Sequence, residues 1–504
     1  MAAMIARVLH AIIEPSALAS IADDSSNYLV MARCFSPWSE PTAVTLSVCG
    51  QQYFPAGFPL LLALAGAEQS FAVAHLVVIG VFFAGLPLLW AQAAAVLRSR
   101  WLAQLVVMCF ALLPGTLLGL QGILSESWYL FLSAAFFFLM GESAQPATAR
   151  RAAAAGAVLG LMIGVRSIGM VMLLAMLARF AVQQLRGTRD THPAWIVPGA
   201  AVAVAALLRI LFPPASTAND YGAIWAGLLG SPQDVPGYLA GQFAALTQSW
   251  ASFIALYWTD DRPLVWIAML GLLVIVFAGL TLRLLSNRLD AWYVAGYLGV
   301  LLIWPFPGQM LRFLFPVMPL MLLQGAWLLV ELARRRPSLR LVPWLAPALI
   351  LAVSVPAQAF LIGRADLAHA KGLNPVYEWL RKPGADEARR ELGLQNRIFE
   401  DLRELGSSLP GDAVVAFYEP SYVALIANRR ALLLPYPADA RAWRLAYEAG
   451  ATHVLLSRIH PRLSRTAIDG LAVSGALPPQ AELLGCSREP LQDLPASCLY
   501  ALHP

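Results

Sequence analysis

The sequence changes character at Asp23-Asp24-Ser25-Ser26-Asn27-Tyr28-Leu29-Val30-Met31-Ala32-Arg33, which follows its first apolar stretch. Two adjacent carboxylates at a membrane boundary are costly to desolvate, so they must lie in a wet, polar niche. The same loop continues to Tyr53-Phe54-Pro55-Ala56-Gly57-Phe58-Pro59-Leu60-Leu61-Leu62, an aromatic segment broken by proline and glycine. An acidic pair followed by a segment that re-enters the bilayer favours an enzyme over a pore.

Composition indicates a polytopic membrane protein. Of the 504 residues, 59% are hydrophobic and 13% are charged, whereas a soluble domain carries about 25% charged residues. Residues 1–363 hold 19 Lys+Arg and 14 Asp+Glu, and residues 364–504 hold 16 of each, so the net charge of +5 belongs to the first part. There is no basic stripe with interleaved aromatic residues, which argues against nucleic acid as a partner.

Apolar runs predict the membrane spans, because a spanning helix needs about 20 apolar residues. Clear candidates are 71–97, 101–120, 126–141, 195–212, 263–285, 291–306, 311–333 and 341–361. The stretch 152–185 is too long for one helix and contains Arg166, so we expect two spans that meet near that residue. With a weaker first candidate at 4–21, the prediction is about eleven transmembrane helices in residues 1–363, with outer loops at 22–70 and 213–262.

Arginine bias orients these spans, since cytoplasmic loops are enriched in positive charge. Twelve arginines fall on one predicted side: Arg98, Arg100, Arg150, Arg151, Arg186, Arg189, Arg283, Arg288, Arg334, Arg335, Arg336 and Arg340. Five fall on the other: Arg33, Arg166, Arg209, Arg262 and Arg312. The first set is therefore assigned to the cytoplasm, and the acidic pair and the C-terminal segment to the outer side of the cytoplasmic membrane.

The segment 238–258 is the least secure part of this topology. It is uncharged and long enough to cross the membrane. A crossing there would move Arg283 and Arg288 to the outer side, so we prefer an interfacial helix within the loop 213–262.

The C-terminal segment has soluble patterning. Residues 394–405 repeat leucine and isoleucine at helical spacing. Short apolar runs at 413–417, 452–456 and 498–502 are typical of strands, and a helix is expected near 438–449. Alternating strands and helices predict a small extracytoplasmic α/β domain. No glycine-rich phosphate fingerprint opens a helix in it, so nothing marks it as nucleotide-binding.

The five cysteines do not form a metal-type Cys-x-x-Cys motif. On the predicted topology four of them face the oxidising side. Cys34 with Cys49, and Cys486 with Cys498, are then candidates for two disulfides, with four unrelated thiols as the alternative. Cys109 lies in an apolar span, where packing explains it.

The acidic residues each have two interpretations. Asp23 or Asp24 could accept a proton from an attacking hydroxyl or orient it, or the pair could solvate or cap a helix end. Glu126 opens a predicted span, where a carboxylate favours the helix dipole. Local pattern favours such capping over a second acidic or acceptor-positioning group in an active site. Asp23 and Asp24 are also candidates for a divalent-metal site, although two carboxylates are few ligands for one.

Two arginines interrupt otherwise apolar sequence on the outer side. A buried arginine needs an anion, and Arg166 and Arg312 would suit a lipid-linked phosphate, which each can bind through two parallel hydrogen bonds. The alternative is a structural network with Asp23, Asp24 or Glu126, and both can hold in a resting state. The sequence has no His-Glu-x-x-His, Gly-x-Ser-x-Gly or Walker motif. It therefore lacks the motif residues typical of zinc proteases, serine hydrolases and ATPases.

The order of these motifs resembles the GT-C superfamily of membrane glycosyltransferases, in the bacterial branch related to protein mannosyltransferases and the lipid A aminoarabinose transferase. The segments that carry the resemblance are Asp23-Asp24 with Tyr28 and Ala32-Arg33, Tyr53 to Leu60, Ser125-Glu126, Arg166-Ser167-Ile168-Gly169, Arg312-Phe313-Leu314-Phe315-Pro316, and Pro410 to Val415. The similarity covers nearly the whole chain. The departures are a poor first span and Pro-Ala where many relatives have Pro-Pro.

The resemblance implies an inverting transfer of a sugar from a polyprenyl-phosphate donor to an acceptor hydroxyl. It implies Asp24, with Asp23 as second choice, as the catalytic carboxylate, Arg166 and Arg312 as phosphate ligands, and Tyr28, Tyr53 and Glu126 as positioning groups. The acceptor is a glycan, a lipid or a protein, within surrounding membrane lipids. No nucleotide is required, because the phosphate bond of the donor carries the free energy, and a divalent metal is compatible. The alternatives are an oligosaccharide ligase or polymerase on a similar scaffold, a lipid or solute transporter, and a catalytically silent assembly partner.

Overall fold

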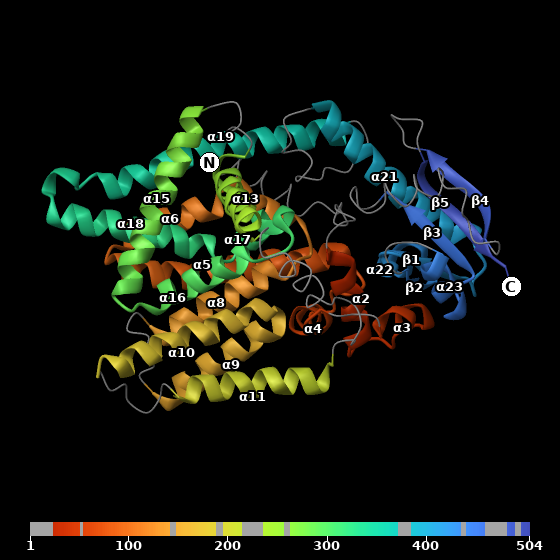
Figure 1. Ribbon diagram of the computed structural model, residues 1–504, viewed down its shortest axis with the longest axis horizontal. Coiled ribbons are helices and arrows are strands. Elements are labelled where there is room, and N and C mark those ends of the chain that lie inside the picture. The colour runs from red at the N-terminus through yellow and green to blue at the C-terminus, as the bar shows by residue number, and fades with distance from the viewer. Residues whose placement is uncertain are drawn as a thin grey trace.

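The computed structural model describes residues 24–50, 54–141, 148–187, 195–213, 235–256, 263–370, 385–434, 440–458, 481–488 and 495–503. The first predicted span at 4–21, Asp23 and Tyr53 lie outside these residues. A bundle of helices forms one part of the molecule and a small sheet domain the other, with the short helices α2 (Ser25–Phe35), α3 (Ala43–Cys49) and α4 (Gly57–Leu64) between them (Figure 1). The membrane-protein architecture with a C-terminal α/β domain is thus the predicted one.

The bundle follows the apolar runs of the sequence. Its helices are α5 (Phe71–Leu97), α6 (Arg100–Ala111), α7 (Pro114–Gln121), α8 (Glu126–Met140), α9 (Ala149–Val165), α10 (Met170–Leu185), α11 (Ile196–Leu211), α13 (Val235–Ala255), α15 (Pro263–Leu285), α16 (Leu289–Leu302), α17 (Met310–Leu314), α18 (Met318–Arg335) and α19 (Val342–His369). Among the described residues, four helical segments are long and apolar enough to cross a membrane, or six if two bent pairs each count as one span. Three shorter apolar helices, α8, α11 and α16, accompany them. The number eleven stays a prediction.

Two predicted spans are broken in the structure. The run 101–120 forms α6 and α7, bent by 55°, and the run 311–333 forms α17 and α18, bent by 66°. Pro114 and Pro316 lie at these breaks, and a proline lacks the amide hydrogen and displaces the residue before it from helical geometry. The second break separates Arg312, on the short helix α17, from the long helix that follows.

The arginine-rich turns gather at the end of the bundle farther from the sheet (Figure 1). Arg334 Nη2 donates to the carbonyl of Leu97 at 3.4 Å, which joins the end of α18 to the end of α5. Arg283 and Asp290 form a buried bidentate pair between α15 and α16, with both bonds at 3.0 Å. One end of the bundle therefore carries the positive turns that the sequence assigned to a single side.

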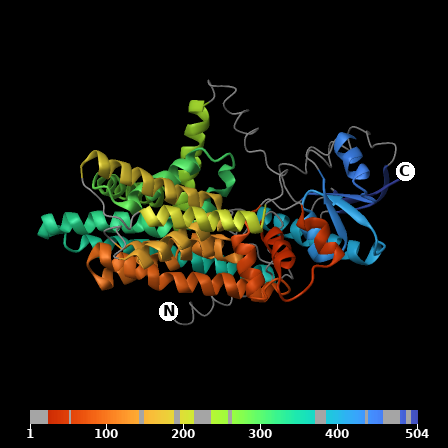
Figure 2. The ribbon, with the colours of Figure 1, turned by 90° about the horizontal axis from the view of Figure 1, so that it is seen from below.

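Helix α13 coincides with the segment that the sequence interpreted as an interfacial helix. It runs across the direction that most of the bundle helices share (Figures 1 and 2). It buries Trp250 and Phe253, and the indole of Trp250 donates to the carbonyl of Met269 at 3.1 Å. A Cβ on Gly115 would lie 2.3 Å from the Phe253 ring, so α7 can approach α13 only through glycine.

The described residues of the C-terminal domain contain a five-stranded mixed sheet. Its strands are β1 (Val414–Phe417), β2 (Arg430–Leu433), β3 (His453–Ser457), β4 (Ala481–Arg488) and β5 (Pro495–Leu502), in the order β2-β1-β3-β5-β4. Strands β1, β2 and β3 are parallel, and β5 is antiparallel to β3 and β4. Helices α21 (Ala385–Ser408) and α23 (Ala440–Glu448) accompany the sheet. Strands β1, β3 and β5 and both helices match the predicted elements, whereas β2 and β4 were not predicted.

Candidate functional site

The first element of the site is α2 (Ser25–Phe35), which begins directly after Asp24. The Asp24 side chain makes no capping hydrogen bond to this helix. Its Oδ2 instead accepts a hydrogen bond from Arg312 Nη2 at 2.6 Å. The carboxylate is thus paired with an arginine 288 residues later in the sequence, and helix capping does not account for it.

Glu126 is the first residue of α8 and is fully buried. Its Oε1 accepts hydrogen bonds from Arg166 Nη1, at 2.6 Å, and from Arg312 Nε. Two guanidiniums therefore neutralise this carboxylate, where the local sequence pattern favoured a helix cap. Glu126 also lies in the first turn of α8, so the favourable position at the helix start and the two ion pairs hold together.

Arg166 lies at the junction that the sequence expected between two paired helices. It ends α9 in an extended conformation, with φ −149° and ψ 133°, before the short helix at Ser167–Gly169. Its Nη1 also donates to Ser125 Oγ at 3.1 Å, and that hydroxyl bonds Tyr28 OH at 3.1 Å. The break in the helix turns the guanidinium toward α8 and α2.

Arg312 completes a continuous ionic network from Asp24 through Arg312 and Glu126 to Arg166. The Phe313 ring lies under both guanidiniums, with its centroid 4.8 Å from Arg166 Cζ and 5.7 Å from Arg312 Cζ. Two carboxylates and two guanidiniums give these four residues a net charge of zero. Arginine stacks on aromatic faces while its edge stays free for hydrogen bonds, so the ring supports both cations without using their donors.

The proline- and glycine-broken segment encloses Tyr28. The Tyr28 ring meets Phe54 at a centroid distance of 5.1 Å and Phe58 at 5.0 Å. A Cβ on Gly57 would lie 2.8 Å from the carbonyl oxygen of Gly164, so glycine is required where α4 (Gly57–Leu64) approaches α9. Burial, with the charge of Asp24, raises the pKa of Tyr28, so its hydroxyl stays protonated as a hydrogen-bonding group.

The structure brings together Asp24, Tyr28, Glu126, Arg166 and Arg312, five of the seven residues that the sequence proposed for catalysis, phosphate binding or positioning. The other two, Asp23 and Tyr53, lie outside the described residues. Sequence reasoning quoted Ser125 and Phe313 only as parts of motifs and gave them no role. Their positions next to Glu126 and Arg312 were the available signal.

Some polar atoms around the network have unused hydrogen-bonding capacity. Ser26 Oγ, Glu126 Oε2 and Ser127 Oγ are buried, and none has a hydrogen-bond partner within the described part of the chain. Buried polar atoms usually have a partner, so this end of the bundle has capacity for further polar groups. Among the described residues, no three His, Cys, Asp or Glu side chains come together as a metal-binding group.

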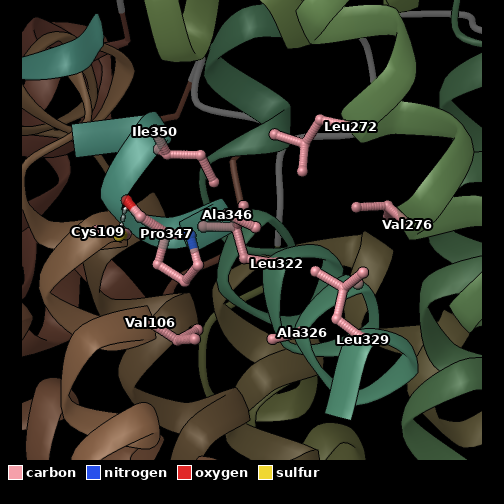
Figure 3. A pocket seen from close by; sticks show the side chains of 11 residues that line it. Val106, Cys109, Leu272, Val276, Leu322, Ala326, Leu329, Ala346, Pro347 and Ile350 are labelled. Carbon is pink, nitrogen blue, oxygen red and sulfur yellow. Dashed lines mark hydrogen bonds between the residues drawn. The ribbon is translucent and has the colours of Figure 1, made fainter. Parts of the chain in front are cut away.

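An apolar crevice lies elsewhere in the bundle, between α6, α15, α18 and α19 (Figure 3). Its lining consists of Val106, Cys109, Leu272, Val276, Leu322, Gly325, Ala326, Leu329, Ala346, Pro347 and Ile350. Cys109 Sγ donates to the carbonyl of Pro347 at 3.2 Å and is a buried free thiol. None of the four charged network residues lines this crevice.

The other four cysteines are joined in two disulfides. Cys34 at the end of α2 is bonded to Cys49 at the end of α3 (Ala43–Cys49). Cys486 is bonded to Cys498 across the paired strands β4 and β5. The first bond lies in the predicted outer loop 22–70, which also carries Asp24 and Tyr28, and the second lies in the sheet domain.

Comparison with known proteins identifies the fold. Neither a family model nor a curated protein matches this sequence. Its structure is similar to that of ArnT from Cupriavidus metallidurans bound to undecaprenyl phosphate, with a TM-score of 0.51 and 11% identity, over 99% of this chain and 97% of ArnT. The chain has a GT-C fold.

Two further GT-C structures are more distant. The archaeal oligosaccharyltransferase AglB from Archaeoglobus fulgidus gives a TM-score of 0.47 at 12% identity, over 90% of this chain and 69% of AglB. The arabinofuranosyltransferase AftD from Mycobacteria gives 0.42 at 13% identity, over 99% of this chain and 40% of AftD. The resemblance that the sequence motifs indicate is therefore confirmed at the level of fold by ArnT.

Proposed function

We propose that this protein is a membrane glycosyltransferase that transfers a sugar from a polyprenyl-phosphate donor to an acceptor hydroxyl. The observation that carries the proposal is the network of Asp24, Arg312, Glu126 and Arg166, which puts a carboxylate next to two guanidiniums at one end of a membrane bundle. The fold shared with ArnT, whose structure contains undecaprenyl phosphate, supports a lipid phosphate as the anion.

The two guanidiniums are suited to the phosphate of such a donor. Arg166 and Arg312 present planar, permanently charged donors that match phosphate oxygens. They would bind the donor and stabilise the negative charge that develops when the phosphate leaves. Since Arg312 already binds Asp24 and Glu126, the entering phosphate competes with these carboxylates for it.

Asp24 is the proposed base. When the phosphate draws Arg312 away, the Asp24 carboxylate can accept the proton of the acceptor hydroxyl. The hydroxyl oxygen forms a bond to the anomeric carbon, and the bond from that carbon to the phosphate oxygen breaks. The phosphate leaves as polyprenyl phosphate, and attack from the opposite face inverts the anomeric centre. Asp23 is the second choice for the base.

Two aromatic hydroxyls complete the proposal. Tyr28 reaches Arg166 through Ser125, and it would hold that arginine in place for the donor. Tyr53 belongs to the same outer loop and is proposed to position donor or acceptor. Glu126 keeps the two arginines together. A divalent metal at Asp23 and Asp24 is compatible with this scheme, in which no step requires it.

We place the reaction at the outer face of a bacterial cytoplasmic membrane, with the C-terminal domain on the same side. The support is the separation of charge along the bundle: the arginine-rich turns lie at one end, and the proposed site and the sheet domain lie at the other. A transporter is a poorer fit, because transport sites lie near the bilayer midplane, whereas this ionic network lies at a bundle end. A ligase that moves a preassembled glycan would use the same groups.

The test compares lipids and glycans by mass spectrometry in cells with and without the protein. We expect a polyprenyl-phosphate sugar to accumulate in its absence and a glycosylated acceptor to disappear. The mass difference on the acceptor separates a single sugar from a preassembled glycan.

The matching variant test replaces the carboxylates. Asp24→Asn should abolish transfer with expression and folding preserved, Asp23→Asn should be milder, and Asp412→Asn, at an exposed position of the sheet domain, should have no effect. Full activity in the double variant of Asp23 and Asp24 would refute the carboxylate mechanism.

A further inference from the structure

Helix α2 lies between the two parts of the molecule and packs on both. Tyr28, Leu29 and Ala32 belong to the hydrophobic core of the bundle. Val30 belongs instead to the core of the C-terminal domain, together with residues of α21 such as Leu402. The helix that follows Asp24 therefore contributes to two hydrophobic cores.

A buried hydrogen bond ties this helix to the C-terminal domain close to Asp24. Ser421 Oγ donates to Asn27 Oδ1 at 2.5 Å across a sequence separation of 394 residues. Both side chains are buried. Asn27 follows Asp24 by three residues, and residues three apart are neighbours on a helix surface, so this bond holds the turn that carries the carboxylate.

The rest of the outer loop is held in the same way. The Cys34–Cys49 disulfide joins the end of α2 to α3, and the amide of Ala431 in β2 donates to Ser47 Oγ in α3 at 3.1 Å. On the bundle side, the Ile123 amide donates to Ser25 Oγ at 3.1 Å. The start of α2 is thus fixed from both sides.

A helix end needs such support. The first turn of a helix lacks intrahelical partners for its amides and frays readily, and Asp24 makes no side-chain cap. Its carboxylate must nevertheless meet a guanidinium that lies 288 residues away in the sequence. The position of Asp24 therefore depends on what holds the residues immediately after it.

We infer that Asn27 and Ser421 are positioning residues for Asp24, and that the C-terminal domain holds the catalytic carboxylate in register with Arg312. The catalytic role of Asp24 in this inference rests on the proposed function. The contact between Asn27 and Ser421 can be tested without a transfer assay. The domain then has a role in the reaction although none of its described residues belongs to the ionic network.

The experiment measures the reactivity of individual carboxylates in the full-length protein in detergent, with a water-soluble carbodiimide and an amine as the probe. Site-resolved mass spectrometry reports labelling at Asp24 and at Asp290, which is paired with Arg283 at the other end of the bundle. In Ser421→Ala we expect labelling of Asp24 to rise about fivefold, the change in population produced by losing one ordinary hydrogen bond. Labelling of Asp290 should not change.

Matched variants separate positioning from general destabilisation. Ser407 is exposed, and its hydroxyl donates only to a carbonyl of its own helix among the described groups, so Ser407→Ala should leave Asp24 labelling unchanged. Asn27→Ala should raise Asp24 labelling as much as Ser421→Ala does. The double variant should raise it no further, because both substitutions remove the same hydrogen bond. Ser421→Thr, which restores a hydroxyl, should return labelling toward the wild-type value.

Two outcomes would overturn the inference. One is unchanged labelling of Asp24 in Ser421→Ala, and the other is a parallel rise at Asp24 and Asp290, which would indicate loosening of the whole fold. Failure of the proposed function has a different signature, since wild-type protein would then not bind undecaprenyl phosphate whatever the labelling shows.

Discussion

Replacing Glu126 by glutamine tests how the ionic network competes with a lipid phosphate. The substitution keeps the shape of the side chain but leaves two guanidiniums with one carboxylate. Arg166 then retains Ser125 as a partner, and Arg312 retains Asp24. The network changes from a net charge of zero to one positive charge, which is the charge an incoming phosphate diester would neutralise.

The cost to the resting protein follows from burial. Removing one partner of a buried ion pair typically costs about 3–5 kcal/mol, because the other charge stays buried. The two arginine side chains are 15% and 17% exposed, and the glutamine carbonyl still accepts a hydrogen bond. We therefore expect a loss of about 3 kcal/mol, at the lower end of that range.

The same change should strengthen lipid binding. In the wild-type protein the phosphate must displace a carboxylate from Arg312, and in Glu126→Gln one competitor is gone. We expect the dissociation constant for undecaprenyl phosphate to fall about tenfold, which corresponds to about 1.4 kcal/mol. Lower stability and higher affinity in one variant is a combination that general damage to the fold does not produce.

The assay is thermal unfolding in detergent with and without undecaprenyl phosphate, together with a direct binding measurement. Saturating lipid should recover more stability in Glu126→Gln than in the wild-type protein, since a ligand stabilises the state that it binds. Glu331→Gln is the control, because Glu331 forms partly exposed pairs with Arg334 and Arg335, and such pairs contribute about 0–1 kcal/mol. Weaker lipid binding in Glu126→Gln would refute the expected competition, because positioning of the two arginines by Glu126 would then outweigh its competition with the phosphate.

Three further outcomes are expected. Arg312→Ala should weaken binding of undecaprenyl phosphate about tenfold or more, since hydrogen bonds to charged groups contribute about 1.5–3 kcal/mol each. Arg334→Ala, at the other end of the bundle, should leave the affinity unchanged. Wild-type affinity in Arg312→Ala would mean that Arg312 has a structural role only. Asp290→Ala should lower the free energy of unfolding by about 3–5 kcal/mol, because Arg283 is left buried without its carboxylate; an unchanged melting temperature would contradict this. A reporter fused after Pro504 should be active outside the cytoplasm, and a cytoplasmic signal would overturn the assigned orientation.

The helices were largely predictable because their signal is local. An apolar run long enough to span a membrane appears in the sequence whatever surrounds it, and α5 and α15 begin and end where those runs do. The bends at Pro114 and Pro316 are also local signals, which the span prediction passed over because it counted hydrophobicity alone. Strand β2, only four residues long, and strand β4, with its exposed leucines, have weak patterns, so pairing with their neighbours decides them.

The charged residues of the ionic network could be singled out from the sequence, but the local patterns left their partners open. An arginine in an apolar run requires an anion, so Arg166 and Arg312 could be singled out from sequence. Whether a carboxylate or a ligand phosphate supplies that anion depends on which helix ends meet. Glu126 shows the difference most clearly, because its position at a helix start is equally consistent with a cap.

The sequence by itself determined a membrane bundle with an α/β tail and the likeness of its motifs to the GT-C superfamily. It also predicted that a group of acidic and basic residues lies on one side of the membrane. These conclusions rest on composition, periodicity and the order of short motifs, which are properties of neighbouring residues. Only the tertiary structure decided that Arg312 bridges Asp24 and Glu126, and that Ser421 holds Asn27. Such contacts join segments hundreds of residues apart, and their geometry is set by how helices pack and where they break.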